Sequence, residues 1–412
     1  MSTVLIGLGL LVFGAHLFRA VFQRTRIPDV LPFFLLGLLI GPLLGWVSPE
    51  AFGSLDAVFT SVVLVVILFE GGLNLKLKDI ADSMSVGARL TVISFAASLL
   101  LMPLLLKPLL GFSWVEGLLA GAILGGTSSA VVIPMAASLP LSEKTRTGLF
   151  LESSLSDVIC IVVTLSLAAT ISSPEVLPGR VLGQILASFL LAVLIGGAGG
   201  LAWSAILDRV HDLEHSLSTT PAFMLIIYGV AEGLGYSGAI AALAFGVALG
   251  NIRDLPLGFL KGFTSFSPVT VSDTEREVYA EVVFIAKAFF FIYIGLQIKG
   301  SSPVLWGVAL LATVLIYAAR IAVVRLSFDA ATPRDDVSTA SALAPKGLAA
   351  AVLAAVPLRA GFTHGKELEA TVYGVVLCSI LLTSTLVFLL RGGAVREAYR
   401  SLFRGYAENE PA

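Results

Sequence analysis

Ionisable side chains inside long apolar stretches are the residues of this sequence best suited to chemistry. The stretch 149–171 carries the run Leu-Glu-Ser-Ser-Leu-Ser-Asp at 151–157, which places two carboxylates within two helical turns. An ionisable group inside a bilayer costs at least ~2.5 to 3.5 kcal/mol on insertion scales, so each one needs a partner or a task. The residues of this kind are Glu70, Glu152, Asp157, Lys287, Arg320 and Lys346.

Depth along the helix separates the two carboxylates. At about 1.5 Å per residue, Asp157 lies roughly 13 Å from the inner end of its stretch, near the bilayer midplane, and Glu152 only about 6 Å in. Arg320 stands about five residues from the inner end of the stretch 303–325, at a depth comparable to that of Glu152. A Glu152–Arg320 ion pair is therefore geometrically allowed and would neutralise both residues. This leaves Asp157 without an obvious basic partner unless Lys346 reaches it.

Asp157 is predicted to be a site for a cation and a proton. A carboxylate near the midplane binds a cation when it is deprotonated and releases it when it is protonated, and intramembrane acids are functional sites by default. Hard monovalent ions take oxygen ligands. Ser153, Glu70 and the backbone at Thr127 are the candidates to complete the shell.

The other residues also have plain structural explanations. A serine in a membrane helix often bonds a carbonyl one turn back, which would occupy Ser153. Glu70 precedes Gly71 close to the inner interface and can extend its carboxylate to water. Because an ammonium group repels a cation, Lys287 and Lys346 are expected to be counter-charges or to line the pathway.

Composition assigns the chain to the membrane and excludes several other classes. It is 57% hydrophobic and 13% charged, against roughly 45–50% and about 25% in soluble domains. A net charge of −2 without a basic run argues against a nucleic-acid partner. Cys160 and Cys378 lie in apolar stretches and no metal-ligand spacing of histidines occurs, so we expect no cofactor beyond the transported ions.

Thirteen stretches are predicted to be membrane helices, since about 20 apolar residues cross a bilayer. With the N-terminus outside, most of the 26 Lys and Arg residues fall on the inner side, as the positive-inside rule requires. We therefore expect a multi-pass cell (inner) membrane protein with a cytoplasmic C-terminus. The stretches are 4–22, 30–47, 57–75, 88–110, 114–139, 149–171, 181–207, 219–235, 238–250, 281–298, 303–325, 337–357 and 367–390.

The order of the stretches predicts an inverted repeat. Stretches 1–6 and 8–13 flank a central seventh and have opposite orientations, which gives two inverted six-helix repeats. The fifth stretch of each half contains a helix-breaking run: 125–130, Gly-Gly-Thr-Ser-Ser-Ala, and 344–347, Ala-Pro-Lys-Gly. Both helices should break near the midplane, where transporters place their ion sites. The predicted fold is an all-α membrane protein with two broken, crossing helices.

These motifs together resemble those of the NhaP-type sodium/proton antiporters of the monovalent cation/proton antiporter superfamily. The likeness covers essentially the whole chain. Its residues are Phe69-Glu70-Gly71, Thr127 in the broken fifth stretch, Glu152-Ser153 followed by Asp157, Phe289-Phe290-Phe291 leading to Gly295-Leu296, and Arg320.

The resemblance implies an elevator-type antiporter, usually a homodimer. In the family, the aspartate matching Asp157 carries the competing proton or cation, and positions matching Glu70, Ser153 and Thr127 help bind the ion. Positions matching Glu152 and Arg320 form a stabilising pair. The implied layout is a membrane domain over 1–395, with a dimerisation part (1–80 and 219–298), a core (88–171 and 303–390), a linker helix (181–207) and a cytoplasmic tail (396–412).

Two departures from the family pattern bear on the ion. Ser156 stands where the family usually has asparagine, and Thr127-Ser128-Ser129 replaces Thr-Asp-Pro, closer to the Thr-Ser-Thr-Ala of potassium-efflux relatives. The second change removes a carboxylate, so K⁺ competes with Na⁺ as the expected cargo. One aspartate instead of two favours electroneutral exchange, which Lys287 or Lys346 would upset by titrating.

Three other functions compete with antiport. A channel or uniporter on the same helices would pass current without proton coupling, and a symporter of related architecture would carry an organic anion. An intramembrane protease is disfavoured because no Ser/His or paired-aspartate arrangement is evident. We therefore expect a transporter for pH homeostasis and not an enzyme.

Overall fold

A computed structural model describes most of the chain, and within that part the structure is helical except for one isolated bridge between Pro333 and Ala407. The all-α prediction is confirmed for these residues. Most of the first predicted stretch, 4–22, lies outside them, so the count of thirteen spans stays a prediction. The described residues are 9, 12–17, 20, 30–47, 55–74, 84–169, 178–211, 216–236, 238–253, 271–297, 302–390 and 394–408.

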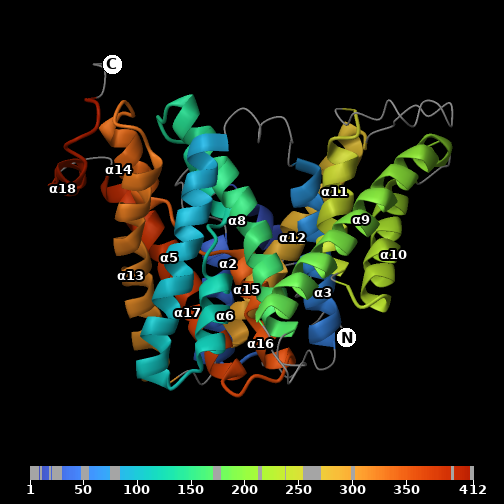
Figure 1. Ribbon diagram of the computed structural model, residues 1–412, viewed down its shortest axis with the longest axis horizontal. Coiled ribbons are helices and arrows are strands. Elements are labelled where there is room, and N and C mark those ends of the chain that lie inside the picture. The colour runs from blue at the N-terminus through green and yellow to red at the C-terminus, as the bar shows by residue number, and fades with distance from the viewer. Residues whose placement is uncertain are drawn as a thin grey trace. The chain divides into compact units, whose positions relative to one another are not determined.

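Six helices of the described part are long and apolar enough to cross a membrane (Figure 1). They are α5 (Met84–Leu110), α8 (Glu143–Ala169), α9 (Pro178–His211), α12 (Asp273–Gln297), α13 (Pro303–Ser327) and α17 (Gly365–Leu389). The shorter ones are α2 (Val30–Leu38), the π-helical η1 (Leu39–Leu43), α3 (Leu55–Asn74), α6 (Trp114–Ile123), α7 (Ser129–Ala137), the 3₁₀ turn η4 (Ser216–Ser218), α10 (Thr219–Gly233), α11 (Gly238–Gly250), α14 (Arg334–Ala342), α15 (Leu348–Leu353), α16 (Ala355–Arg359) and α18 (Ala394–Leu402).

Both predicted interruptions are present. Residues 124–128 separate α6 from α7, and residues 343–347 separate α14 from α15. α6 begins with a capping box in which the Ser113 hydroxyl accepts from the Glu116 backbone and the Glu116 carboxylate accepts from the Ser113 backbone. The inverted repeat itself stays a prediction.

Two predicted helix starts are wrong. α12 begins at Asp273 and not at 281, because Ser272 and Glu275 cap its first turn. α8 begins at Glu143 and not at 149, with Ser142 accepting from the Thr145 backbone. Charged residues mark where a helix leaves lipid, but the backbone hydrogen bonds continue past that point.

The chain divides into two compact units. The first comprises Met1–Gly53, Ser83–Ser172 and Ala288–Ala412, and the second comprises Ser54–Asp82 and Ser173–Lys287. Helix α12 contributes to both. The predicted dimerisation, core and linker parts stay predictions.

In the first unit, α5 packs against α6, α8 and α13, and α13 packs against α17. Small residues permit this close packing, as is common between membrane helices. A Cβ on Gly121 of α6 would lie 2.7 Å from the Ser98 carbonyl oxygen of α5, and one on Gly295 would lie 2.7 Å from the Leu38 nitrogen. Side chains larger than hydrogen at these two glycines would push the helices apart.

In the second unit, α11 packs against both α3 and α9. A Cβ on Gly72 of α3 would lie 2.9 Å from the Val247 nitrogen of α11, so this contact also depends on glycine. Phe69 and Phe245 have ring centroids 5.6 Å apart at the centre of a buried aromatic cluster. The same unit carries Glu70, one residue after Phe69.

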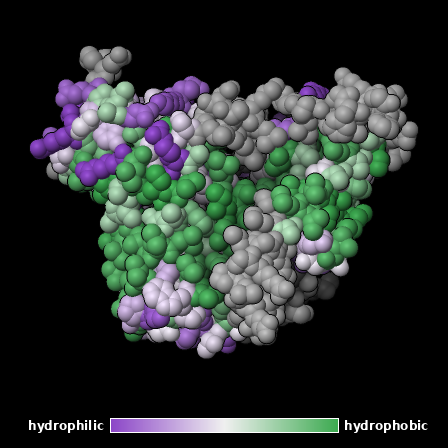
Figure 2. Space-filling model, viewed as in Figure 1, coloured by the Kyte–Doolittle hydropathy of each residue, from purple (hydrophilic) through white to green (hydrophobic). Residues whose placement is uncertain are grey.

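The outer surface agrees with a lipid environment. Large apolar residues are more than half exposed on α5, α9 and α13, among them Leu100, Leu194 and Leu310. Figure 2 shows broad hydrophobic surface, with hydrophilic residues gathered at the end that carries α14 and α18. An exposed apolar surface of this extent needs a non-aqueous partner, which the bilayer provides.

Candidate functional site

The two helix breaks of the first unit contact each other. The Ser128 backbone N–H donates to the Pro345 carbonyl at 2.8 Å, and the Lys346 Nζ donates to the Gly126 carbonyl at 2.8 Å. Each break thereby satisfies backbone groups that the other has released from helical pairing, as non-helical backbone at membrane depth requires. The two predicted breaks therefore contact each other, while the crossing of the two broken helices stays a prediction.

Glycine and serine make this close approach feasible. A Cβ on Gly347 would collide with the Ser128 side chain, so the second break can pass the first only without a side chain at 347. The Lys346 backbone N–H donates to the Ser379 hydroxyl of α17 at 2.9 Å. Lys346 is only 2% exposed, so its ammonium group is held inside the unit by the Gly126 carbonyl.

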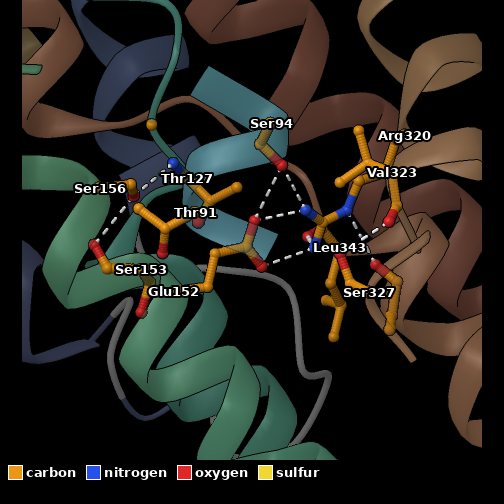
Figure 3. Close-up of polar contacts among 12 residues, drawn as sticks. Thr91, Ser94, Thr127, Glu152, Ser153, Ser156, Arg320, Val323, Ser327 and Leu343 are labelled. Atoms are coloured by element: carbon orange, nitrogen blue, oxygen red, sulfur yellow. Dashed lines mark hydrogen bonds and ion pairs between the residues drawn. The ribbon is translucent and has the colours of Figure 1, made fainter. Parts of the chain in front are cut away.

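Helix α8 places three predicted site residues beside the first break. The Ser156 hydroxyl accepts from the Thr127 backbone at 3.1 Å and donates to the Ser153 carbonyl at 3.2 Å (Figure 3). The Asp157 Oδ2 accepts from the hydroxyl of Ser129, the first residue of α7, at 2.9 Å. The structure therefore brings Thr127, Ser156 and Asp157 together, with Ser129 as a contact that the sequence did not reveal.

Ser153 makes the local bond expected of a serine in a membrane helix. Its hydroxyl donates to the Phe150 carbonyl at 3.0 Å. A hydroxyl that donates its proton keeps its lone pairs, so the Ser153 oxygen can still accept a cation. Ser153 and Asp157 are four residues apart and face the same side of α8.

The Thr127 hydroxyl is a polar atom that the protein leaves unsatisfied. Thr127 is 2% exposed, and its Oγ1 has no hydrogen-bond partner among the described residues. A buried polar atom without a partner costs about 1–3 kcal/mol. Such a cost is recovered if an ion or water binds there.

Thr127 is one of the residues that line a small cavity of about 20 Å³. Its polar lining includes Ser94, Thr127, Arg320 and Lys346. A cavity of at least about 10–15 Å³ with two to four polar partners holds one water molecule. Two of the lining residues, Arg320 and Lys346, are cationic, which disfavours a cation in this cavity.

The predicted ion pair is present and fully buried. Arg320 Nη2 donates to Glu152 Oε2 at 2.7 Å, and Nη1 donates to Oε1, which makes the pair bidentate (Figure 3). Arg320 and Glu152 are 2% and 1% exposed. The Ser94 hydroxyl of α5 accepts from Arg320 Nη1 at 2.9 Å and donates to Glu152 Oε1 at 3.2 Å.

Arg320 also binds the second break. Its Nε donates to the Ala340 carbonyl at 3.2 Å and its Nη2 to the Leu343 carbonyl at 3.4 Å. These carbonyls belong to the end of α14, where a helix leaves acceptors unpaired and favours positive charge. Arg320 therefore joins α13 to α8, α5 and α14, which goes beyond the pairing predicted from depth.

Two predicted residues belong to the second unit. The Glu70 Oε1 accepts from the Asn74 side chain at 2.7 Å on α3, and Lys287 is the last residue of that unit and half-buried on α12. The first-unit geometry thus contains Thr127, Ser128, Glu152, Ser153, Ser156, Asp157, Arg320 and Lys346. The roles predicted for Glu70 and Lys287 stay predictions.

Sequence reasoning overlooked the polar face of α5. Thr91, Ser94 and Ser98 are buried, and Ser98 donates to the Leu124 carbonyl at the start of the first break at 3.4 Å. Their spacing of three and four residues is a usable signal, because it places small hydroxyls on one helix face. Within the described residues no cluster of three or more His, Cys, Asp and Glu could hold a resident metal ion.

Known proteins share this sequence pattern. The family profile "Sodium/hydrogen exchanger, transmembrane" matches residues 10–392. The K(+)/H(+) antiporter NhaP2 of Shewanella sp. (strain ANA-3) is 25% identical over 392 residues, covering 92% of this chain and 65% of that protein. The Na(+)/H(+) antiporter 1 of Methanocaldococcus jannaschii is 24% identical over 316 residues, covering 71% of this chain and 68% of that protein.

The fold is also shared with a solved structure. The sodium proton antiporter MjNhaP1 from Methanocaldococcus jannaschii aligns with a TM-score of 0.73 over 95% of this chain and 98% of that chain, at 21% identity. The resemblance to NhaP-type antiporters predicted from the motifs is confirmed. The chain spans 65% of the length of the NhaP2 relative.

Proposed function

The chain belongs to the sodium/hydrogen exchanger, transmembrane, family, and we propose that it is a secondary active antiporter that exchanges a monovalent cation for a proton. The surroundings of Asp157 carry the proposal. This carboxylate accepts from Ser129 at the first helix break, next to Thr127, whose buried hydroxyl has no hydrogen-bond partner in the described part of the chain. A carboxylate near a hydroxyl without a hydrogen-bond partner provides oxygen ligands for reversible binding of a cation.

Asp157 is the residue that binds the cation and the proton in turn. Deprotonated, it binds the cation together with the oxygens of Thr127 and Ser153. Protonated, it loses the charge that attracts the cation, so the ion leaves. Because one carboxylate serves both ligands, the cation and the proton do not travel together, and acid slows uptake of the cation.

The buried charges support one-for-one exchange. Glu152 and Arg320 cancel, and Lys346 offsets an ionised Asp157, so the formal charge of this group is zero without a ligand. Either a monovalent cation or a proton on Asp157 adds one positive charge. The two loaded forms then carry equal charge, which favours electroneutral exchange at any membrane potential.

We propose Na⁺ as the favoured cargo, with K⁺ as the alternative. Two relatives of similar sequence identity differ in the ion of their names: NhaP2 is named a K(+)/H(+) antiporter, and antiporter 1 of Methanocaldococcus jannaschii a Na(+)/H(+) antiporter. The first break offers the Ser128 and Ser129 hydroxyls in place of a carboxylate, which weakens the field at the site and reduces the preference for the smaller ion. No cofactor takes part in this exchange.

Alternating access of the elevator type follows from the same proposal. Both broken helices, α8 and the Glu152–Arg320 pair belong to one compact unit, which supports movement of that unit as a body. The proposed protein is a homodimer in the cell (inner) membrane, with the N-terminus outside and the C-terminus in the cytoplasm.

Proton flux in proteoliposomes tests the proposal. Purified protein is reconstituted with a pH-sensitive dye inside, a proton gradient is set, and Na⁺, K⁺, Li⁺ or choline is added outside. Asp157→Asn is compared with Glu143→Gln, which makes the same change at the exposed first turn of the same helix. We expect Na⁺ or K⁺ to drive proton flux in the wild type and in Glu143→Gln, and no flux in Asp157→Asn.

Other results would point elsewhere. Cation currents without coupled proton movement would indicate a channel or uniporter. Proton or sodium movement that requires an organic anion would indicate a symporter. Full coupled flux in Asp157→Asn would remove Asp157 from the mechanism.

A further inference from the structure

A second cavity lies in the first unit, at the end that carries the C-terminal tail, and it shares no residue with the exchange site. Its volume is about 860 Å³, within the roughly 300–1,000 Å³ typical of small-molecule sites. Its walls come from the α7–α8 connection, the start of α14, the end of α17 and α18. In Figure 1, α14 and α18 lie beside each other at this end.

The chain's own tail forms part of the rim and is firmly held. The Arg334 backbone donates to the Ala407 carbonyl at 3.0 Å, and the Ala407 backbone donates to the Ala330 carbonyl at 2.9 Å. Arg334 Nε donates to the Tyr406 carbonyl at 2.9 Å. Ala407 and Glu408 of this tail segment line the cavity.

Two buried polar residues of α14 line the cavity with unused bonding capacity. Ser338 is 2% exposed, and its hydroxyl has no partner among the residues that the structure describes. Asp336 is 3% exposed and accepts from the Ser142 backbone at 3.1 Å and from the Ser142 hydroxyl, both on Oδ2. The second carboxylate oxygen of Asp336 remains to bind a donor.

The charges around the cavity favour a cation. Asp335 is neutralised by Arg396 at 2.6 Å and Arg400 at 3.4 Å, and Glu408 is paired with Arg334 at 3.3 Å. Asp336 has only the uncharged Ser142 as its partner within the described part of the chain. A buried carboxylate in that situation is stabilised by a cationic ligand.

The remaining wall is apolar. Leu139, Leu141, Val387 and Leu390 line it, and the space greatly exceeds that of a single inorganic ion. A ligand that fits both walls has a positively charged nitrogen at one end and a hydrocarbon body. Aliphatic amines have this composition.

We propose that this cavity is a binding site for a small organic cation of the aliphatic amine class, with its ammonium group on Asp336 and the Ser338 hydroxyl and its methylene chain along Leu139 and Leu390. Both polar contacts belong to α14, whose last turn is bound by Arg320. A bound amine therefore contacts α14, the helix that Arg320 connects to the exchange site. The binding does not depend on Asp157.

Ligand-dependent unfolding of the purified full-length chain tests the site. The probe is hexylamine, which has one ammonium group and a six-carbon chain, compared with hexanoate and with NaCl and KCl at matched ionic strength. Every titration is repeated in Asp157→Asn, which removes the proposed exchange carboxylate. We expect a saturable rise in unfolding temperature with hexylamine in both proteins, and none with hexanoate, because only the amine binds the native state.

Variants locate the binding. Asp336→Asn should weaken hexylamine binding at least tenfold and Ser338→Ala several-fold, while Asp329→Asn, which changes a carboxylate outside the cavity, should leave it unchanged. Leu390→Trp fills the cavity from the apolar wall without altering a charge, so it tests the site even if Asp336→Asn does not fold. Absence of saturable binding, equal binding in Leu390→Trp, equal stabilisation by NaCl or KCl, or loss of binding in Asp157→Asn would overturn the proposal.

Discussion

Helix α8 holds two carboxylates five residues apart that have very different surroundings. Glu152 is 1% exposed and accepts hydrogen bonds from the two terminal nitrogens of the Arg320 guanidinium group and from the Ser94 hydroxyl. Asp157 is partly exposed and accepts from the Ser129 hydroxyl at the edge of a helix break. Two carboxylates on the same helix thus differ in their surroundings: Glu152 is held in a buried ion pair, and Asp157 lies outside that pair and is partly exposed. The surroundings of each acid, and not its chemistry alone, are the reason that Asp157 is the one proposed to exchange ions.

Breaking the fixed pair should have the largest effect on stability. Arg320→Ala leaves the Glu152 charge buried and removes donors from the second break, so we expect a loss of about 3–5 kcal/mol in the free energy of unfolding. Denaturant unfolding in detergent micelles measures it. The control is Arg325→Ala, at the exposed end of the same helix. An Arg320→Ala protein as stable as this control would contradict a structural role for the pair.

Removing the serine that shares the pair should cost less. Ser94→Ala deletes one hydrogen bond to each charged partner but keeps the ion pair, so we expect a loss of about 1.5–3 kcal/mol. Ser94→Thr keeps the hydroxyl and serves as the comparison. Exchange in Ser94→Ala should retain its dependence on pH, since Asp157 is unchanged; a shifted pH profile would instead connect Ser94 to proton binding.

A substitution near Asp157 should have the opposite effect, altering cation binding and not stability. Thr127→Val removes a buried hydroxyl that lacks a partner in the described part of the chain, so stability should be unchanged or slightly higher. The cation concentration for half-maximal exchange should rise several-fold because a ligand oxygen is lost. Thr164→Val is the matched control, since the Thr164 hydroxyl on α8 is buried and unsatisfied as well. Equal effects of the two variants on cation affinity would remove Thr127 from the site.

The smallest effect concerns an exposed ion pair at the end of the same unit. The Asp329 carboxylate lies 3.0 Å from Lys144 and 3.3 Å from Arg89, and hydrogen bonds from these two hold the pKa of Asp329 below its usual 3.8. A carboxylate whose pKa is lower in the folded than in the unfolded state stabilises the fold at pH values above both pKa values. This stabilisation is lost as the pH falls through the pKa of the folded state. Asp329→Asn should therefore lower the unfolding temperature slightly at neutral pH, and it should have no effect at a pH below the pKa of Asp329 in the folded state. An equal decrease at both pH values would show that packing, and not charge, is responsible.

Fixed helix geometry explains what the sequence could predict. The rise per residue sets the depth of Glu152 and Arg320, and their comparable depth allows the ion pair that the structure contains. Glycine and proline runs likewise predicted both breaks. Contacts that depend on how helices pack could not be predicted in this way. Ser94, Ser129 and Ser379 are ordinary small polar residues in the sequence, and only the folded chain shows what they bind.

Helix ends were less predictable than helix centres. Charged residues correctly indicated the edges of apolar stretches, but α8 and α12 continue beyond them under the caps of Ser142 and Ser272. The hydrophobic pattern reports where lipid ends. The backbone hydrogen bonds, which need no lipid, report where the helix ends.

Competition between cation and proton at Asp157 tests the central claim most directly. The measurement is the rise in unfolding temperature with added Na⁺ or K⁺, at mildly acidic and mildly alkaline pH, for the wild type, Asp157→Asn and Glu143→Gln. We predict that cation stabilisation is larger at alkaline pH in the wild type and in Glu143→Gln and is absent in Asp157→Asn. A pH-dependent cation stabilisation that survives in Asp157→Asn would contradict the assignment of Asp157 as the shared site.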